Sequence, residues 1–502
     1  MRTEHTGYSG FRGVGARLTE EPLAHLNSHK SSLLGESVHA IHAFDKAHAL
    51  MLSEEGINTR DIGRKILSAF REIERGGVEE VRGRADGGMH SGEHYLIQTQ
   101  GEAVGGRLHL GRSSGDLIEV ARRMTFRNHV HALLGALCDV REALLELAGV
   151  HLGTVMPGYT HGQHAQPTTF AHWSTMFAEV FARDTARLLS FHVRLNRSPA
   201  GAAILTGSDF PLNRQRVSDL LGFDAPLPHT MDAILSHDLE MEYASVLAVV
   251  AQGLGRIADD LILWSTTEFA MVELPDRYCG TSSIMPQKKN PDGLEDMKSV
   301  AARSMGVVVT VMAAEKGPTG FPIMERRHSQ AILWDLGRDL GVRFDSMGPL
   351  LRDMAVNVQR MHTLAGANWA QVTDLSGALV RVSGFDWRTA HQVVAVLVRR
   401  CAAAGIRPDA ATSAHLDEAA TETGAPAPHL SASVFADAMD PRAFVERRVL
   451  YGGPASASVA RESASARLLL DADRAQVAAL RAQADAAAQA LDTAIDAFLA
   501  QP

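Results

Sequence analysis

The spacing of proline is the feature that most limits what this chain can fold into. No proline occurs between Pro22 and Pro157, and none occurs between Pro228 and Pro275. Proline breaks a helix interior because it lacks a backbone N–H and its ring clashes with the preceding turn. Both spans can therefore be continuous helix, and the sequence predicts helices well above the usual length of about three turns.

Apolar residues within these spans follow a helical period. Between residues 235 and 261 they recur at steps of three and four, which places them on one face of a helix. A single helix from Thr230 to near Thr267 would measure roughly 55 Å. Similar patterns predict helices between Pro167 and Pro199 and from Asp116 to about Leu152. Alternating strand patterns are nearly absent, so we predict an all-α fold built as an elongated bundle of long helices.

The chain changes character along its length. Beyond about residue 365 the predicted helices shorten, and an Ala-, Thr- and Pro-rich stretch at 421–433 indicates a surface connection. We predict an N-terminal helical domain over 1–115, a central long-helix bundle over 116–365 and a C-terminal helical domain over 366–502. The Ala-rich final stretch predicts a terminal helix that packs on its own domain, with a partner-seeking coiled coil as the alternative.

Composition and charge favour a protein that acts on small molecules. The formal net charge is -9, and no basic stripe compensates for the repulsion of nucleic acid. The three cysteines show no paired spacing, which predicts reduced thiols and a cytoplasmic protein. The N-terminus lacks the apolar core of a secretory signal, and no run approaches the ~18 apolar residues of a membrane span. We therefore expect no nucleic-acid partner and no membrane.

The segment GTSSIMPQKKNPDG at 280–293 combines hydroxyls and lysines with little core-forming content. Asn290, Pro291 and Asp292 form a helix start signal, with Asn at the cap, Pro at the first helical position and an acid in the first turn. Lys288 stands where it can neutralise an anion. A nearby ammonium, backbone donors and exclusion of water can favour a serine alkoxide as a base. The segment predicts a mobile catalytic loop, with a polar surface loop that caps a helix as the alternative.

Two further segments place similar groups ahead of helices. GYTHGQHAQP at 158–167 sets Thr160 beside His161 at a predicted turn, although a lone histidine is more often structural or solvated. GGRLHLGRSSGDLIEV at 105–120 joins Arg112 to hydroxyls at a helix start, which suits a bound carboxylate or simple capping by a serine. No His-Glu-x-x-His pattern or nearby thiol accompanies these histidines, so we predict no metal and no cofactor.

These segments together carry a family resemblance. GTSSIMPQKKNP is similar to the GSSxMPxKxN signature of the aspartase/fumarase superfamily. GYTHGQHAQP is similar to the threonine–histidine segment of argininosuccinate lyase, and HLGRSSGD to its HxGRSRND segment. Similarity continues at 47–52, 370–394 and 440–455. The chain resembles the argininosuccinate lyase branch along nearly its whole length.

The resemblance implies a homotetramer whose long helices form a twenty-helix core, with each active site assembled from three subunits. It implies a carbon–nitrogen lyase that reversibly eliminates an amine from an N-substituted aspartate and releases fumarate. The catalytic residues implied are Ser282 as the base, His161 as the proton donor or the group that orients one, Glu295 as its partner, and Lys288. The substrate-binding residues implied by the match are Arg112, Ser113, Ser114, Thr160, Asn290, Met324 and Arg326.

The chain departs from the argininosuccinate lyase pattern where the amine would bind. Three pairs of family residues are replaced: Arg-Asn by Ser114 and Gly115, Gly-Ser by Phe44 and Asp45, and Glu-Asp by Ser91 and Gly92. A Tyr-Asn-Arg-Asp-Leu-Gln run is replaced by IMERRHSQ at 323–330, which sets Arg326 beside Arg327.

Basic side chains repel a guanidinium leaving group and suit an amine that carries its own carboxylate. The departures therefore predict an aminopolycarboxylate substrate of the ethylenediamine disuccinate or iminodisuccinate kind. An ordinary argininosuccinate lyase and another superfamily chemistry, such as fumarate hydration, are the enzyme alternatives. A non-catalytic structural protein like the delta crystallins is an alternative of another class, which the intact set of catalytic residue types disfavours.

Overall fold

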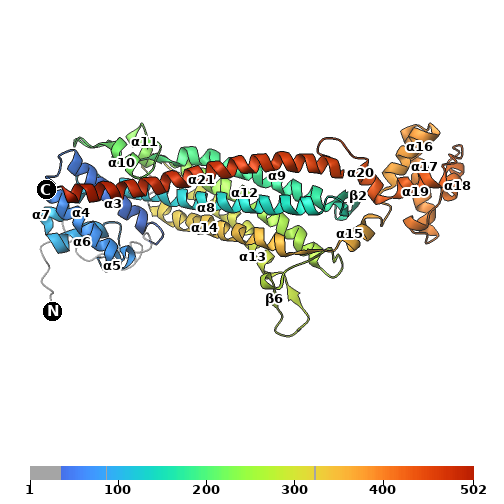
Figure 1. The fold of residues 1–502 in the computed structure, drawn as a ribbon, viewed down its shortest axis with the longest axis horizontal. Helices are drawn as coiled ribbons and strands as arrows, with labels where there is room; N and C mark the ends of the chain where they lie inside the picture. The colour runs from blue at the N-terminus through green and yellow to red at the C-terminus, as the bar shows by residue number, and fades with distance from the viewer. Residues whose placement is uncertain (1–34, 86–87, 321–323, 502) are drawn as a thin grey trace.

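A computed structural model describes residues 35–85, 88–320 and 324–501 of the chain. The described chain is mostly helical, and it forms a long body with a smaller group of helices at each end (Figure 1). The predicted all-α, elongated long-helix architecture is confirmed. Short strands accompany the helices and pair as two-stranded sheets.

Long helices running side by side form the central bundle (Figure 1). They are α8 (Ser114–Val150), α9 (Phe170–Leu195), α12 (Asp238–Ser265), α13 (Asp292–Ala314), α14 (Met324–Asp353) and α21 (Ser456–Ala500). Their apolar faces meet in one large buried core, in which the ring of Tyr243 on α12 stacks on Phe191 of α9 at a centroid distance of 5.2 Å. The bounds of α8 and α9 confirm the helices predicted for those segments.

The N-terminal group of helices has its own buried core, which includes Phe44 and Phe70. Its elements are α3 (Val38–Glu54), α4 (Arg60–Arg75), α5 (Val78–Arg84), α6 (Ser91–Gln100), α7 (Glu102–Gly105) and the 3-10 helix η1 (Gly106–His109). Two short helices, α10 (Arg214–Leu220) and α11 (Thr230–Leu235), lie near this end of the bundle (Figure 1).

The C-terminal group of helices lies at the opposite end of the body and has a separate core around Leu379 and Leu397 (Figure 1). Its elements are α16 (Val372–Ser383), α17 (Trp387–Ala403), η3 (Pro408–Ala410), α18 (Ser413–Glu422), α19 (Ala432–Met439) and α20 (Pro441–Glu446). The short elements η2 (Asp276–Tyr278) and α15 (Val358–Ala365) complete the helical structure.

The strands form antiparallel pairs except for one short parallel pair. The pairs are β1 (Val155–Thr160) with β2 (Gln163–Thr169), β3 (Arg197–Ser198) with β4 (Ala225–Pro226) in parallel, β5 (Val272–Glu273) with β8 (Ala355–Val356), and β6 (Gly280–Thr281) with β7 (Lys289–Asn290). The β1–β2 and β6–β7 hairpins carry candidate site residues.

The predicted single helix from Thr230 to near Thr267 is wrong at its start, because the chain breaks between α11 and α12. Ser236 ends α11 in an extended conformation, and its hydroxyl donates to Asp238 Oδ1 at 2.5 Å. At the break, His237 Nδ1 lies 2.5 Å from Glu315 Oε2. Polar side chains that pair with one another and with Glu315 thus lie where the two helices separate, within an apolar stripe that periodicity alone predicts to be continuous.

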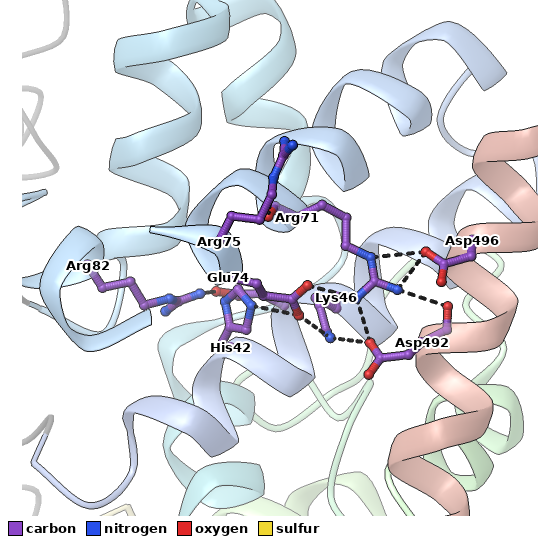
Figure 2. Close-up of polar contacts among 9 residues, drawn as sticks. His42, Lys46, Arg71, Glu74, Arg75, Arg82, Asp492 and Asp496 are labelled. Carbon is purple, nitrogen blue, oxygen red and sulfur yellow. Dashed lines mark hydrogen bonds and ion pairs between the residues drawn. The ribbon is translucent and has the colours of Figure 1, made fainter. Parts of the chain in front are cut away.

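The terminal helix α21 contacts the C-terminal group through Ser456 at its start and Glu446 of α20 but packs mainly along the bundle, so the prediction that it packs on its own domain is wrong. It runs back along the bundle to the N-terminal group (Figure 1), where Leu491 and Ile495 join the N-terminal core. Figure 2 shows the polar contacts at its end: the ammonium of buried Lys46 lies 2.7 Å from Asp492 Oδ1 and 2.5 Å from Glu74 Oε1. The last turns of the chain therefore belong by packing to the N-terminal group, through contacts about 450 positions away in sequence.

By length and composition alone, α13 is apolar enough to cross a membrane, although only 39% of the relevant window is buried inside the chain. It packs against α12 and α14, and it begins with Asp292 and Glu295 in its first turn. Because core helices of proteins without membrane spans satisfy the same measure, this helix does not identify a membrane protein. It leaves an apolar face, including Met305 and Val309, exposed in the single chain.

Candidate active site

Ser282 lies in a hairpin that projects from the side of the bundle (Figure 1). β6 and β7 pair Gly280 with Asn290 and Thr281 with Lys289. Ser282 Oγ accepts hydrogen bonds from the backbone N–H groups of Ile284 and Met285 at 3.3 and 3.1 Å. Hydrogen bonds of this kind stabilise an oxygen more strongly when it is negatively charged. The predicted loop therefore gives its serine a polarised environment before any substrate arrives.

The ends of this hairpin are held by specific contacts. A Cβ at Gly280 would meet Asp292 Oδ2 at 1.8 Å, so a larger residue there would force the Asp292 side chain at the start of α13 to move. Lys289 Nζ forms ion pairs with Glu273 and Asp276 at 2.6 and 2.7 Å, and these carboxylates raise the pKa of Lys289. The neighbouring Lys288 side chain is exposed. Of the two adjacent lysines, one fixes the hairpin and the other faces solvent.

The helix start predicted at Asn290 is wrong by one residue. Asn290 belongs to β7, Pro291 is the N-cap with a φ of -80° and a ψ of 49°, and α13 begins at Asp292. The strand pairing of Asn290 with Gly280 competes with capping and prevails. Glu295 remains in the first turn of α13, where its side chain is exposed.

Thr160 and His161 lie at the tip of the β1–β2 hairpin. Thr160 pairs with Gln163, so His161 and Gly162 form a two-residue turn, with φ values of 53° and 71°. Positive φ at both central residues is typical of a type I′ hairpin turn, which glycine adopts without strain. The predicted turn is confirmed. The side chains of Thr160 and His161 are exposed in the single chain, and the predicted partnership of His161 with Glu295 stays a prediction for an assembled protein.

Ser113 caps the N-terminus of α8. Its hydroxyl accepts from the N–H of Gly115 at 3.3 Å, and Asp116 Oδ2 accepts from the N–H of Ser113 at 2.9 Å. Such reciprocal capping satisfies two backbone donors at the first turn. Burial raises the pKa of Asp116 to about 7, although its backbone hydrogen bond and Arg112 oppose that rise. The α8 terminus thus carries a carboxyl group that titrates near neutral pH.

Ser114 contacts a histidine that the sequence analysis did not select. His90 Nε2 lies 2.9 Å from Ser114 Oγ, and His90 and Glu93 both lie at the start of α6. His109, at the end of η1, completes a cluster whose ligand atoms all lie within 4.8 Å of one another. The His-x-x-Glu spacing was a signal for this cluster in the sequence, but the contribution of His109 depends on tertiary structure.

Arg112 is buried rather than free to face solvent. Its guanidinium lies 2.7 Å from Asp45 Oδ1 and packs over the ring of Phe44, and Arg82 pairs with the other oxygen of Asp45. Burial tends to raise the pKa of Asp45, but the guanidinium groups of Arg112 and Arg82 outweigh it and hold that pKa below its usual value. Arg112 therefore has a carboxylate partner within its own chain.

Arg326 is also engaged by carboxylates. Its guanidinium nitrogens lie 3.3 Å from Glu119, 2.7 Å from Glu240 and 3.1 Å from Glu315. Burial opposes the charge, but the three carboxylates raise the pKa of Arg326 above its usual value. The expectation that this arginine offers a free positive charge to a substrate is not met in the single chain. Met324 begins α14, but its side chain, like that of Arg327, lies outside the described residues.

The candidate residues do not meet within one chain. Ser113 caps the start of α8, whereas the hairpin with Thr160 and His161 follows the other end of that helix. A helix of 37 residues spans about 55 Å. No reacting group could touch both ends, so Ser113 cannot act together with Thr160 and His161 of the same chain.

Comparison with known proteins shows to which family the chain belongs. The profile of a family described as Lyase matches residues 31–306, and one described as Argininosuccinate lyase C-terminal matches residues 369–446. Argininosuccinate lyase of Methanoculleus marisnigri is 37% identical over 437 residues, which cover 86% of this chain and 87% of that protein. Argininosuccinate lyase of Methanococcoides burtonii is 36% identical over 427 residues, with 84% and 85% covered.

Comparison of the fold with solved structures leads to the same family. The crystal structure of EDDS lyase in complex with formate matches with a TM-score of 0.86 and 33% sequence identity, covering 93% of both chains. A class II fumarase from Schistosoma mansoni shares the fold alone, with a TM-score of 0.68 and 18% identity. This chain belongs to the argininosuccinate lyase branch of the aspartase/fumarase superfamily, and it is a carbon–nitrogen lyase that forms fumarate.

Proposed function

We propose that the substrate is an N-substituted aspartate whose leaving amine carries a carboxylate, an aminopolycarboxylate of the ethylenediamine disuccinate or iminodisuccinate kind. The observation that carries this proposal is the charge next to Ser113. Two buried guanidinium groups, those of Arg82 and Arg112, share the single carboxylate of Asp45. The net positive charge of this triad repels a guanidinium leaving group and attracts a carboxylate.

Two further observations support this choice of substrate. Ser114 and Gly115 stand where the family pattern has an arginine and an asparagine, so the amine would meet different groups here. The likeness to EDDS lyase extends over 93% of the chain. Arg326 no longer supports the proposal, because three carboxylates of its own chain surround it.

In the proposed mechanism, Ser282 removes a proton from the carbon beside one carboxylate of the substrate. The N–H groups of Ile284 and Met285, which already donate to Ser282 Oγ, favour the alkoxide that this step needs. The resulting aci-carboxylate carries two negative charges, and Lys288 and Asn290 of the same hairpin stabilise it. His161 then donates, or orients the donor of, the proton that the departing nitrogen requires.

We propose further that a homotetramer assembles the site from three chains. The separation along α8 supports this, because it keeps Ser113 away from Thr160 and His161 within one chain. Exposed apolar side chains on the bundle supply surface for association: Met176, Val193, Val249, Leu263, Met305 and Val309. Burying apolar surface of this kind drives oligomer formation.

Argininosuccinate is the second candidate substrate. The match to argininosuccinate lyases at 36–37% identity and the match of residues 369–446 favour it. In that case the chain releases arginine together with fumarate. The two candidates differ only in the amine half, so the same fumarate assay separates them.

The test measures fumarate by its ultraviolet absorbance. The enzyme is incubated with ethylenediamine disuccinate, iminodisuccinate and argininosuccinate, and in reverse with fumarate and the corresponding amines. We expect release from an aminopolycarboxylate and a loss of about 100- to 10,000-fold in the Ser282→Ala variant. Turnover of argininosuccinate alone would reject an aminopolycarboxylate as the substrate. Full activity of the Ser282→Ala variant would reject the proposed mechanism.

A further inference from the structure

A cluster of two histidines and one glutamate lies beside the start of α8. His90 precedes α6, Glu93 lies in its first turn, and His109 ends η1. His90 Nδ1 is 3.7 Å from Glu93 Oε2, and His109 Nδ1 is 3.4 Å from the same oxygen. The two imidazole rings are tilted at 50° to each other, with their centroids 5.2 Å apart. Two nitrogens and one carboxylate oxygen thus converge on one point.

We propose that His90, Glu93 and His109 bind one divalent first-row transition ion, such as Zn²⁺ or Co²⁺. Zinc lies about 2.0–2.2 Å from imidazole nitrogen and carboxylate oxygen, so neighbouring ligands of a tetrahedral ion are about 3.4 Å apart. The two distances to Glu93 Oε2 are close to that separation. The third pair lies within 4.8 Å, so a small rotation of a ring closes the set.

The orientation of His90 fits ligation through Nδ1. Its other nitrogen, Nε2, lies 2.9 Å from Ser114 Oγ. An Nε2–H that donates to this hydroxyl leaves the lone pair of Nδ1 directed at Glu93, which is the tautomer that a metal requires. Ser114 thereby acts as a positioning residue for the ion.

Burial and charge also suit a cation. Glu93 is only 4% exposed, and a buried carboxylate is costly unless a positive partner neutralises it. The guanidinium of Arg112, whose charge acts on His90, already pairs with Asp45. A bound dication would supply that positive partner to Glu93.

The ligand set leaves one coordination position open. Two histidines and a carboxylate are three protein ligands, and zinc takes a fourth from water or a substrate. The side chain of His109 is 25% exposed, so the open position is reachable from solvent. Its location beside Ser113 and Ser114 suits a carboxylate or an amine as the fourth ligand. That use of the ion rests on the proposed function, whereas the binding of the ion does not.

The test measures metal binding without reference to lyase activity. The full-length protein is treated with a chelator, and Zn²⁺ is titrated into it by calorimetry, with the visible absorption of bound Co²⁺ as a second readout. We expect one ion per chain and at least a tenfold loss of affinity in Glu93→Gln and in His109→Ala. Ser114→Ala should weaken binding by about 10- to 100-fold, because it removes the contact that orients His90.

His129→Ala is the matched control. His129 also pairs with a single carboxylate, that of Glu36 at 2.8 Å, but it has no place in the cluster. This variant should bind the ion as the unmodified protein does, and circular dichroism verifies that each variant is folded. The proposal is overturned if the folded protein binds no ion, or if Glu93→Gln and His109→Ala bind it unchanged.

Discussion

Asp45 Oδ1 lies 2.7 Å from a guanidinium nitrogen of Arg112, and both side chains are about 1% exposed. The other oxygen of Asp45 pairs with Arg82, which is fully buried. This carboxylate joins α3 to the residue that precedes the cap of α8, and thus links the N-terminal core to the proposed substrate-binding end of the bundle. Removing it would leave two buried guanidinium groups without the carboxylate that they share.

Asp45→Asn should therefore lower the free energy of unfolding by about 3–5 kcal/mol, the usual cost of breaking a buried ion pair. Urea unfolding followed by circular dichroism measures this change. Asp61→Asn is the control, because Asp61 pairs with Lys65 on the surface and its loss should cost less than about 0.5 kcal/mol. Equal effects of the two substitutions would contradict a structural role for Asp45.

Gly92 and Asp45 should be energetically coupled. A Cβ at position 92 would lie 2.5 Å from Asp45 Oδ2 and 2.6 Å from an Arg82 nitrogen, so Gly92→Asp should destabilise the protein. In an Asp45→Ser background the same change should stabilise it, since it returns a carboxylate to Arg82 and Arg112. A double-mutant cycle measures the coupling, expected at about 1–3 kcal/mol. If the effects of the two substitutions on the free energy of unfolding are additive, residues 92 and 45 are not energetically coupled.

Two buried histidines should lower the stability of the protein as the pH drops below about 6.5. His131 Nε2 lies 3.0 Å from His192 Nε2 in the bundle core, near Arg127, Arg481 and Asp224. Burial lowers the pKa of His131 to about 3 and that of His192 to about 4, from 6.5. The unfolded chain takes up protons below pH 6.5, whereas the folded chain does not until about pH 4. Acidification therefore favours unfolding over this range.

The free energy of unfolding should decrease with falling pH by a slope that approaches about 1.4 kcal/mol per pH unit for each histidine. This value follows from the linkage between proton uptake and stability. Urea unfolding at pH 7, 6 and 5 measures it, and His131→Gln should reduce the slope. His39→Gln, at an exposed position, serves as the control and should leave the slope unchanged. A wild-type slope that survives His131→Gln intact would reject this assignment.

Two inactive variants should restore activity to each other when mixed. Ser282→Ala and His161→Asn alter residues on separate hairpins, and the proposed site takes them from different chains. In randomly reassembled tetramers with equal amounts of both variants, about one quarter of the sites would combine an intact Ser282 with an intact His161. Fumarate release after denaturation and joint refolding measures the recovery. Absence of recovery, with tetramers formed, would indicate a site within one chain.

The helices were the part of the fold most readily predicted from sequence. The apolar spacing of α8 and α9 specifies a helix locally, since side chains three and four residues apart share a face. Local rules failed where a competing contact decided the outcome. Asn290 pairs with Gly280 instead of capping α13, and Ser236 and His237 end a helix that the apolar stripe continues.

The sequence by itself determined the helical architecture, the turn at His161 and the family signature around Ser282, because each depends on residues close together in the chain. Only the tertiary structure decided where charged groups find their partners. Arg326 meets Glu119 and Glu240 across 207 and 86 positions, and Lys46 meets Asp492 across 446. The electrostatic energy of a buried charge depends on distance in space and on burial, neither of which local spacing specifies.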